Sequence, residues 1–190
     1  MLVALVGPSG SGKTTLSKNI YEWASNTLPL LSYTTRAPRS TDIKGEYAYV
    51  SATEFESLEK AGAFAWVAGH YGNRYGTRTE DVRLALDDLE RIHVAILIVD
   101  VVTTLRRLAS ASAGELCFIY LLIDDEEELR RRMGAEAGRT GIDERLAAAK
   151  VENAKAQKLG NLLHTIDATL PPEEVTERAV RIINLFANSA

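Results

Sequence analysis

Residues 7–14 read GPSGSGKT, between an apolar run at Leu2–Val6 and a helical pattern that extends to about Ser25. This is the G-x-x-x-x-G-K-[ST] pattern of a phosphate-binding loop, in the strand–loop–helix order that its mechanism requires. The glycines let the chain turn so tightly that successive backbone N–H groups point at phosphate oxygens, and the start of the helix adds partial positive charge. The motif predicts nucleotide binding; a glycine-rich turn that only caps a helix is the alternative interpretation.

Two side chains of this loop have predicted roles in phosphate chemistry. Lys13 is expected to reach the β- and γ-phosphates of a nucleotide, and the Thr14 hydroxyl to hold Mg²⁺. A second magnesium ligand is predicted at Asp100, which follows four apolar residues, although an ordinary strand end explains that pattern equally well. The predicted nucleotide-binding residues are Gly7, Pro8, Ser9, Gly10, Ser11, Gly12, Lys13, Thr14 and Thr15.

Apolar runs alternate with helical patterns along the rest of the chain, which predicts an α/β fold with a mostly parallel sheet. Three runs are continuous enough to be fully buried strands: Leu2–Val6, Ile92–Val99 and Leu116–Ile123. Further helices are predicted near Val102–Ala109, Asp125–Met133 and Ile142–Lys158. A last amphipathic helix begins at Pro171, where two prolines precede two glutamates.

The stretch from about Tyr33 to Glu90 interrupts this alternation. It is rich in Tyr, Gly, Thr and Arg, and is predicted to be a small mixed α/β insertion between two core strands. Its predicted strand segments are Tyr47–Ser51 and Phe64–Ala68, and its predicted helices are Thr53–Ala61 and about Thr79–Leu89.

Composition narrows the class of protein. The chain has 190 residues, 46% of them hydrophobic, which predicts one globular domain with a substantial core. Its net charge of −4 argues against binding to duplex nucleic acid. Its longest apolar runs are too short to span a bilayer, and its N-terminus lacks the pattern of a signal peptide. The single cysteine, Cys117, is interpreted as a buried thiol in a reducing cytoplasm, and the three histidines share no metal-ligand spacing.

The insertion carries two arginines that are suited to a second phosphate. Arg36 and Arg39 are three residues apart with Pro38 between them, so they are able to grip one dianion in a forked manner. Tyr47 and Tyr75 offer phenolic hydrogen bonds to the same group. Solvated arginines and packed tyrosines are the alternative interpretation.

The order of these motifs resembles the guanylate kinase family over nearly the whole chain. The shared features are GPSGSGKTT, TTRAPR at 34–39, a YAYVS strand, a GNRYGT turn at 72–77 and ERLAAA at 144–149. The resemblance implies a P-loop NTPase fold with a parallel-sheet core (1–31 and 91–190), an acceptor-binding insertion (32–90) and a helical lid within about 124–145. It also implies phosphoryl transfer from ATP with Mg²⁺ to a nucleoside monophosphate, best GMP or dGMP, by a monomer or homodimer. The implied substrate-binding residues are Ser32, Arg36, Arg39, Tyr47, Tyr75, Thr77 and Asp100.

One position departs from the family pattern in the base pocket. A glutamate that accepts from guanine N1–H and the exocyclic amine is replaced by Trp66, which is able to donate but not to accept. Trp66 is expected to pack beneath the pocket or to stack on the base. The residue at position 66 therefore does not imply guanine selectivity, and Asp100 is a second candidate for contact with the base amine.

The lid segment is rich in arginine. The resemblance implies that Arg132, Arg139 and Arg145 close over the transferring phosphoryl group, with Lys13 and Arg39 as the other catalytic residues. Arg130 and Arg131 are instead assigned to a solvated helix face, because glutamates precede them at i−4, and pairs are expected at Glu126–Arg130, Glu127–Arg131 and Glu128–Arg132.

Two other functions were weighed against this one. The first is the same chemistry on another acceptor, either a different nucleotide or a ribose bisphosphate. The second is a non-catalytic module like the guanylate-kinase-like domains of scaffold proteins, which is disfavoured because the Gly12-Lys13-Thr14 sequence is intact. A GTPase is disfavoured because the Asn-Lys-x-Asp motif does not occur.

Overall fold

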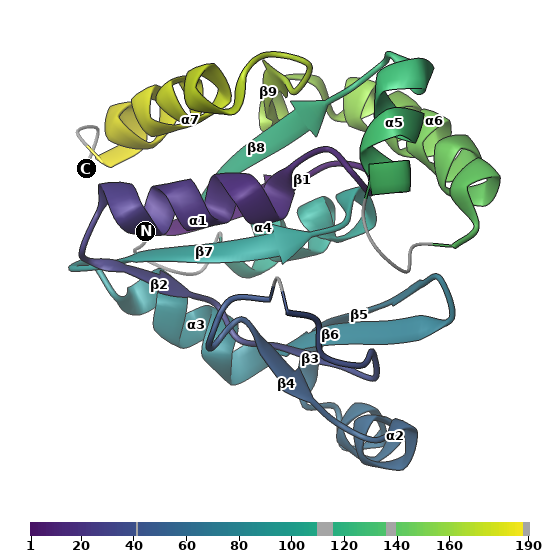
Figure 1. Ribbon diagram of the computed structural model, residues 1–190. Coiled ribbons are helices and arrows are strands. Elements are labelled where there is room, and N and C mark those ends of the chain that lie inside the picture. The colour runs from purple at the N-terminus through teal and green to yellow at the C-terminus, as the bar shows by residue number, and fades with distance from the viewer. Residues whose placement is uncertain (41, 110–115, 136–139, 188–190) are drawn as a thin grey trace.

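The computed structural model describes residues 1–40, 42–109, 116–135 and 140–187. Its core is a five-stranded parallel sheet in the order β2-β7-β1-β8-β9 (Figure 1). The strands are β1 (Leu2–Val6), β2 (Thr27–Pro29), β7 (Ile92–Leu97), β8 (Leu116–Leu122) and β9 (His164–Asp167). β1 lies in the middle, so the loop that follows it opens at the centre of the sheet's carboxyl edge, the edge where open α/β sheets bind ligands.

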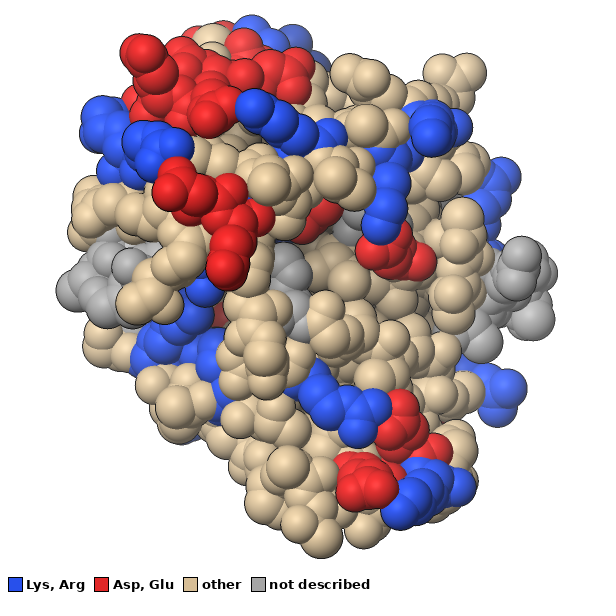
Figure 2. Space-filling view, turned by 90° about the vertical axis from the view of Figure 1, so that its right-hand side faces the viewer, with Lys and Arg blue, Asp and Glu red and all other residues tan. Residues whose placement is uncertain are grey.

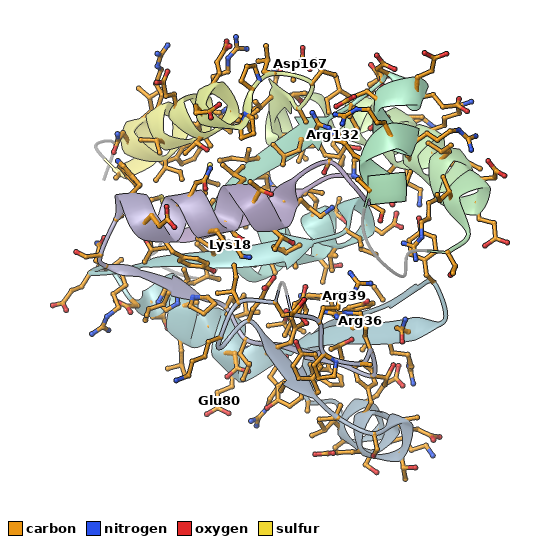
Figure 3. The ribbon with its side chains drawn as sticks, in the orientation of Figure 1. Lys18, Arg36, Arg39, Glu80, Arg132 and Asp167 are labelled. Atoms are coloured by element: carbon orange, nitrogen blue, oxygen red, sulfur yellow. The ribbon has the colours of Figure 1, made fainter. Side chains whose placement is uncertain are left out.

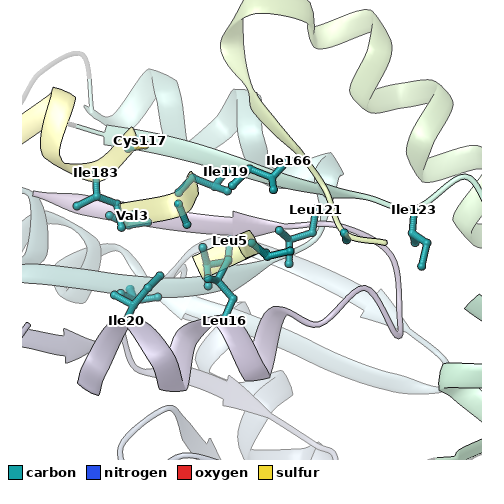
Figure 4. Packing of buried hydrophobic residues seen from close by; sticks show 14 of the residues in the cluster. Val3, Leu5, Leu16, Ile20, Cys117, Ile119, Leu121, Ile123, Ile166 and Ile183 are labelled. Carbon is teal, nitrogen blue, oxygen red and sulfur yellow. The ribbon is translucent and has the colours of Figure 1, made fainter. Parts of the chain in front are cut away.

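Helices cover both faces of this sheet (Figure 1). Helices α1 (Lys13–Trp23) and α7 (Pro172–Ala187) pack on one face, and α3 (Thr79–Asp87) and α4 (Val102–Ala109) pack on the other. Successive side chains of β1 alternate between the two faces, as the pleat of a strand requires. Val3 and Leu5 contact the first pair of helices, as Figure 4 shows for part of this cluster, and Leu2 and Ala4 contact the second.

Two further helices lie near the carboxyl edge. Helix α5 (Glu126–Ala135) buries Leu129 and Met133 against the side of the core that holds α1. Helix α6 (Ile142–Leu159) follows it, and short 3₁₀ turns lie at Val99–Val101 and Gly160–Leu162. In the described part of the chain no helix has the combined length and apolar character needed to cross a membrane.

The insertion forms a second sheet, in the order β4-β3-β6-β5. Its strands are β3 (Ser32–Thr34), β4 (Tyr47–Tyr49), β5 (Phe64–His70) and β6 (Asn73–Arg78), and helix α2 (Ala52–Lys60) packs on β5. β3 pairs with β4 in parallel, whereas the other pairs are antiparallel. In Figure 1 this sheet lies below the carboxyl edge of the core sheet.

The structure confirms the predicted α/β class and corrects details. The GNRYGT segment is not a turn: Asn73–Thr77 belongs to β6, and the reversal of the chain is made by Tyr71 and Gly72, both with positive φ. The last predicted helix of the insertion, α3, packs into the core, because its Val82 and Leu86 join the cluster of Leu2 and Ala4. The thiol of Cys117 is buried as expected.

Candidate functional site

A cleft of about 690 Å³ separates the phosphate-binding loop from the inserted sheet. Among the described residues that line it are six basic side chains and a single carboxylate, that of Asp42. Figure 3 shows that Arg36 and Arg39 come from the insertion below and Arg132 from α5 above. The basic residues of the lining are Lys13, Lys18, Arg36, Arg39, Arg131 and Arg132. A cavity with this excess of cations, in a chain of net charge −4, is suited to a polyanion.

Two glycines of the loop are required by geometry. Gly7 has φ 148°, and a Cβ there would lie 2.8 Å from the Leu121 carbonyl oxygen. Gly10 has φ 84°, and its Cβ would lie 2.9 Å from Met133 Cγ of α5. Side chains at these positions would therefore collide with β8 and α5.

Lys13 begins α1, directly after the loop. Its ammonium group donates to the Gly7 carbonyl at 2.6 Å and to the Pro8 carbonyl at 2.8 Å. The lysine thus folds back over its own loop and lies in the lining of the cleft. This position is where a point charge meets phosphates that bind to the loop.

The two predicted magnesium ligands lie in different surroundings. Thr14 lines the cleft at the start of α1, next to Thr15. Asp100 is outside the lining, and its carboxylate accepts from the Lys155 ammonium of α6 at 2.6 and 2.9 Å. Mg²⁺ commonly takes one or two protein oxygens, several waters and substrate phosphates, so Thr14 fits such an ion without Asp100.

The wall formed by the insertion is organised by Asp42. Arg36 donates to one Asp42 oxygen at 2.9 Å, and the backbone N–H of Arg39 donates to the other at 2.7 Å. Tyr49 OH donates to that second oxygen at 2.5 Å. Burial opposes the ionisation of Asp42, but the hydrogen bonds from Arg36, Tyr49 and Arg39 outweigh it and lower the carboxyl pKa.

Two tyrosines complete this wall. Tyr47 and Tyr75 both line the cleft, with ring centroids 6.5 Å apart in an edge-to-face arrangement. The Arg36 guanidinium carbon lies 5.0 Å from the centroid of Tyr47, within the range of a cation–π contact. Burial, together with the charge of Glu46, raises the pKa of the Tyr47 phenol, so it remains a hydrogen-bond donor at neutral pH.

Hydroxyl groups and an indole form the predicted base end of the cleft. Ser32 lines the cleft, and Thr77 lies fully buried behind it, with 3.1 Å between their hydroxyl oxygens. Trp66 is 7% exposed, packs in the cluster with Leu2 and Ala4, and also lines the cleft. Trp66 thus belongs both to the core and to the surface of the cleft. Its indole Nε1 is buried and has no hydrogen-bond partner in the structure.

The lid arginines differ from one another in placement. Arg132 lines the cleft and donates to Glu128 at 2.7 Å. Arg131 is 70% exposed, as its predicted place on a solvated face implies, but it also lines the cleft. It forms a two-pronged pair with Glu128, one residue past the expected partner Glu127. The pairing with Glu128 is possible because residues three apart lie side by side on a helix, as residues four apart do. Hydrogen bonds from Arg131 and Arg132 lower the pKa of Glu128 to about 2.

The remaining arginines of the lid segment are Arg130, Arg139 and Arg145. Arg145 is in the first turn of that helix and donates to Ser9 Oγ of the phosphate-binding loop at 3.2 Å. Arg139 lies outside the described residues. Arg130 points away to Asp143, at 2.7 Å, and to Glu126, at 3.9 Å, which agrees with its predicted place on the outer face.

Besides Arg131, the polar side chains in the lining that were not predicted from the sequence include Lys18, Asn19 and Asp42. Lys18 and Asn19 follow Thr14 and Thr15 by four positions, so helical periodicity places them on the same face of α1 and was the signal available. No comparable signal marks Asp42, because its role depends on how the loop after Arg39 folds back.

Direct transfer between two phosphorylated substrates needs a loop that cradles phosphate and a wall of arginines that faces this loop across one cleft. The reason is that such catalysis consists mainly of positioning and charge neutralisation. The fold and the cleft thus define a P-loop kinase. A family model described as guanylate kinase matches residues 1–164. The chain belongs to the guanylate kinase family.

Individual relatives agree with this assignment. A guanylate kinase of Geobacter metallireducens is 35% identical over 161 residues, which are 83% of this chain and 74% of the relative. One of Anaeromyxobacter dehalogenans is 37% identical over 162 residues, 82% of this chain and 68% of the relative. The crystal structure of guanylate kinase from Anaplasma phagocytophilum covers 97% of this chain and 85% of its own, with a TM-score of 0.71 and 22% identity, and so has the same fold.

Proposed function

We propose that this chain transfers the γ-phosphoryl group of ATP to the 5′-phosphate of GMP or dGMP, giving ADP and GDP or dGDP. The observation that carries the proposal is the pair of walls around one cationic cleft: the phosphate-binding loop with Lys13 on one side, and Arg36 and Arg39 on the other. The family to which the chain belongs supports the same reaction.

ATP is the donor in this proposal, with its phosphates on the loop at residues 7–15. Gly7 and Gly10 let the loop pass close to β8 and α5, and the Lys13 ammonium, which donates here to the Gly7 and Pro8 carbonyls, turns to the phosphate oxygens. Thr14 would hold Mg²⁺, which when bound would neutralise charge on the β- and γ-phosphates. Asp100 would be a second ligand, although it accepts hydrogen bonds from Lys155 in this structure.

The acceptor lies against the insertion, residues 32–90. Arg36, Arg39, Tyr47 and Tyr75 hold its phosphate, while Ser32, with Thr77 behind it, meets the base. Arg132 from the lid, residues 124–145, and Arg145 from α6 then stabilise the charge that spreads over the transferred group. Arg139 has the same role by its place in the lid. Closure of the insertion toward the core expels water from the reacting phosphates.

The setting of the reaction follows from its substrates. We place it in the cytoplasm, where nucleotides are available, with a monomer or homodimer as the active form. On the face shown in Figure 2, acidic and basic side chains are intermixed rather than gathered into one basic surface. That pattern does not suit a duplex nucleic acid as the partner.

A single assay tests the proposal. The protein is incubated with Mg-ATP and each nucleoside monophosphate separately, and ribose 1,5-bisphosphate is included as another acceptor; ADP release and the phosphorylated product are both measured. GMP or dGMP is expected to give the highest kcat/KM. Turnover only with ribose bisphosphate, or ATP binding without turnover on any acceptor, would contradict it.

A further inference from the structure

Arg145 joins three parts of the chain that are far apart in the sequence. Its Nη1 donates to Ser9 Oγ of the phosphate-binding loop at 3.2 Å, and its Nε donates to the Thr140 carbonyl at 2.9 Å. Its guanidinium carbon lies 3.7 Å from the centroid of the Tyr71 ring. Tyr71 is at the tip of the β5–β6 hairpin, which Figure 1 shows directly below the start of α6.

The backbone at this tip is unusual for a tyrosine. β5 and β6 are joined by Tyr71 and Gly72 alone, because His70 and Asn73 are already paired across the strands. Tyr71 has φ 48° and Gly72 has φ 75°, the signs that a type I′ turn requires at both central positions. Asparagine or glycine adopts that first position readily, whereas a bulky aromatic residue does so at a cost in backbone strain. Stability of the hairpin therefore does not explain a tyrosine here.

Arg145 lies in the first turn of α6, at the end of the helix that carries partial positive charge, and follows the acidic Asp143 and Glu144. Ser9, Thr140 and Tyr71 are neutral groups, so none of these three contacts cancels the charge of the guanidinium. Held in this way, the arginine faces the loop without losing its attraction for a phosphate.

We propose that Tyr71 is a positioning residue, whose ring holds the Arg145 guanidinium beside the phosphate-binding loop. The inference rests on the proposed function, in which Arg145 contacts the transferring phosphoryl group. Because Tyr71 belongs to the acceptor-binding insertion and Arg145 to the end of the lid segment, the contact ties the place of the arginine to the place of the insertion. Acceptor binding and the assembly of the catalytic charges are thereby linked.

Three substitutions at Tyr71 separate positioning from folding. Tyr71→Phe keeps the ring and is expected to retain kcat within about 2-fold. Tyr71→Asn removes the ring but suits the positive φ, so melting temperature is expected to hold or rise while kcat falls about 10-fold, the size of a partly desolvated cation–π contact. Tyr71→Leu removes the ring without relieving the backbone, and is expected to lose kcat equally and stability as well. A structural role alone predicts that activity follows stability across the three.

A double-mutant cycle with Arg145→Gln tests whether Tyr71 acts through Arg145. In the Arg145→Gln background, Tyr71→Asn is expected to have no further effect on kcat. The same cycle is measured on the Kd of Mg-ATP by titration calorimetry, where Tyr71→Asn is expected to weaken binding about 3-fold only when Arg145 is present. The calorimetric measurement needs no turnover. A wild type that phosphorylates no nucleotide would therefore overturn the proposed function, while the Kd of Mg-ATP would still show whether Tyr71 positions Arg145. Wild-type kcat in Tyr71→Asn, or additive effects in both cycles, would overturn the positioning role.

Discussion

Arg36 and Asp42 form an ion pair at 2.9 Å in the wall of the cleft. Because Asp42 also accepts from the backbone of Arg39, one carboxylate orders the whole segment that bears both arginines. Arg36 is 8% exposed, whereas Arg39 is exposed at the surface of the cleft. Arg39 is thus the cation on this wall that meets an incoming phosphate first.

Replacing Arg39 with alanine is expected to impair use of the acceptor and to leave ATP binding unchanged. A forked, charge-assisted contact is worth about 2–3 kcal/mol, so KM for the nucleoside monophosphate should rise about 30- to 150-fold. The Kd of Mg-ATP is measured without acceptor. Arg83→Ala, an exposed arginine on α3 outside the cleft lining, is the matched control. A comparable loss of ATP affinity in Arg39→Ala would contradict the assignment of two separate walls.

Lys13→Ala is expected to abolish turnover. The charge of Lys13 acts on phosphates whose charge redistributes in the transition state, and loss of such a group costs about 100-fold or more in kcat. Since the ammonium also holds the Gly7 and Pro8 carbonyls, the melting temperature is recorded beside the rate. An intact fold that retains more than about a tenth of wild-type kcat would count against the kinase mechanism.

We expect this protein to select less strongly among bases than it would with a carboxylate at position 66. The only carboxylate among the described lining residues, Asp42, is held by Arg36, and Trp66 accepts no hydrogen bond. Trp66→Glu is expected to raise the GMP-to-AMP ratio of kcat/KM by up to about 10-fold, for one contact worth about 1.5 kcal/mol.

The ratio is the right quantity to measure for that variant. Trp66 is buried among apolar residues, so a glutamate there lowers stability, but the ratio of two kcat/KM values does not depend on the folded fraction. The comparison uses GMP, dGMP, AMP and UMP with both enzymes. A wild type that already prefers GMP by several orders of magnitude would show that a different group reads the base.

The buried carboxyl of Glu46 is expected to make stability depend on pH. Glu46 is 5% exposed, and burial raises its pKa despite a hydrogen bond from the Ile43 backbone. A carboxyl whose pKa is higher in the folded than in the unfolded state destabilises the fold as pH rises from the unfolded value through the folded one. The glutamine of Glu46→Gln is neutral at every pH, so this substitution removes the loss of stability that accompanies ionisation.

The measurement is a set of thermal unfolding curves between pH 4 and pH 8. Glu46→Gln is expected to melt at a higher temperature than the wild type at pH 7–8 and to show no advantage near pH 4. Glu22→Gln, at an exposed position on α1, is the control and should follow the wild type throughout. A constant difference at all pH values would refute the role of ionisation.

Elements with a strong local pattern were predicted closely. β1 and α4 have the predicted bounds, and α6 exceeds its predicted range by one residue, because continuous apolar runs and helical spacing are local properties. The short strands β2, β3 and β9 were not predicted. Three or four residues carry too little periodicity, and these strands exist because longer neighbours offer them hydrogen-bonding edges.

The sequence by itself determined the parts of this protein whose chemistry is contiguous: the phosphate-binding loop, the arginine pair at 36 and 39, and the family they indicate. Tertiary structure alone decided which side chains meet across the fold. It placed Thr77 behind Ser32, turned Asp100 toward Lys155, and brought Tyr71 onto Arg145. Motif spacing specifies local backbone geometry, whereas these pairings depend on how two sheets and α6 pack, and packing is set by the whole chain at once.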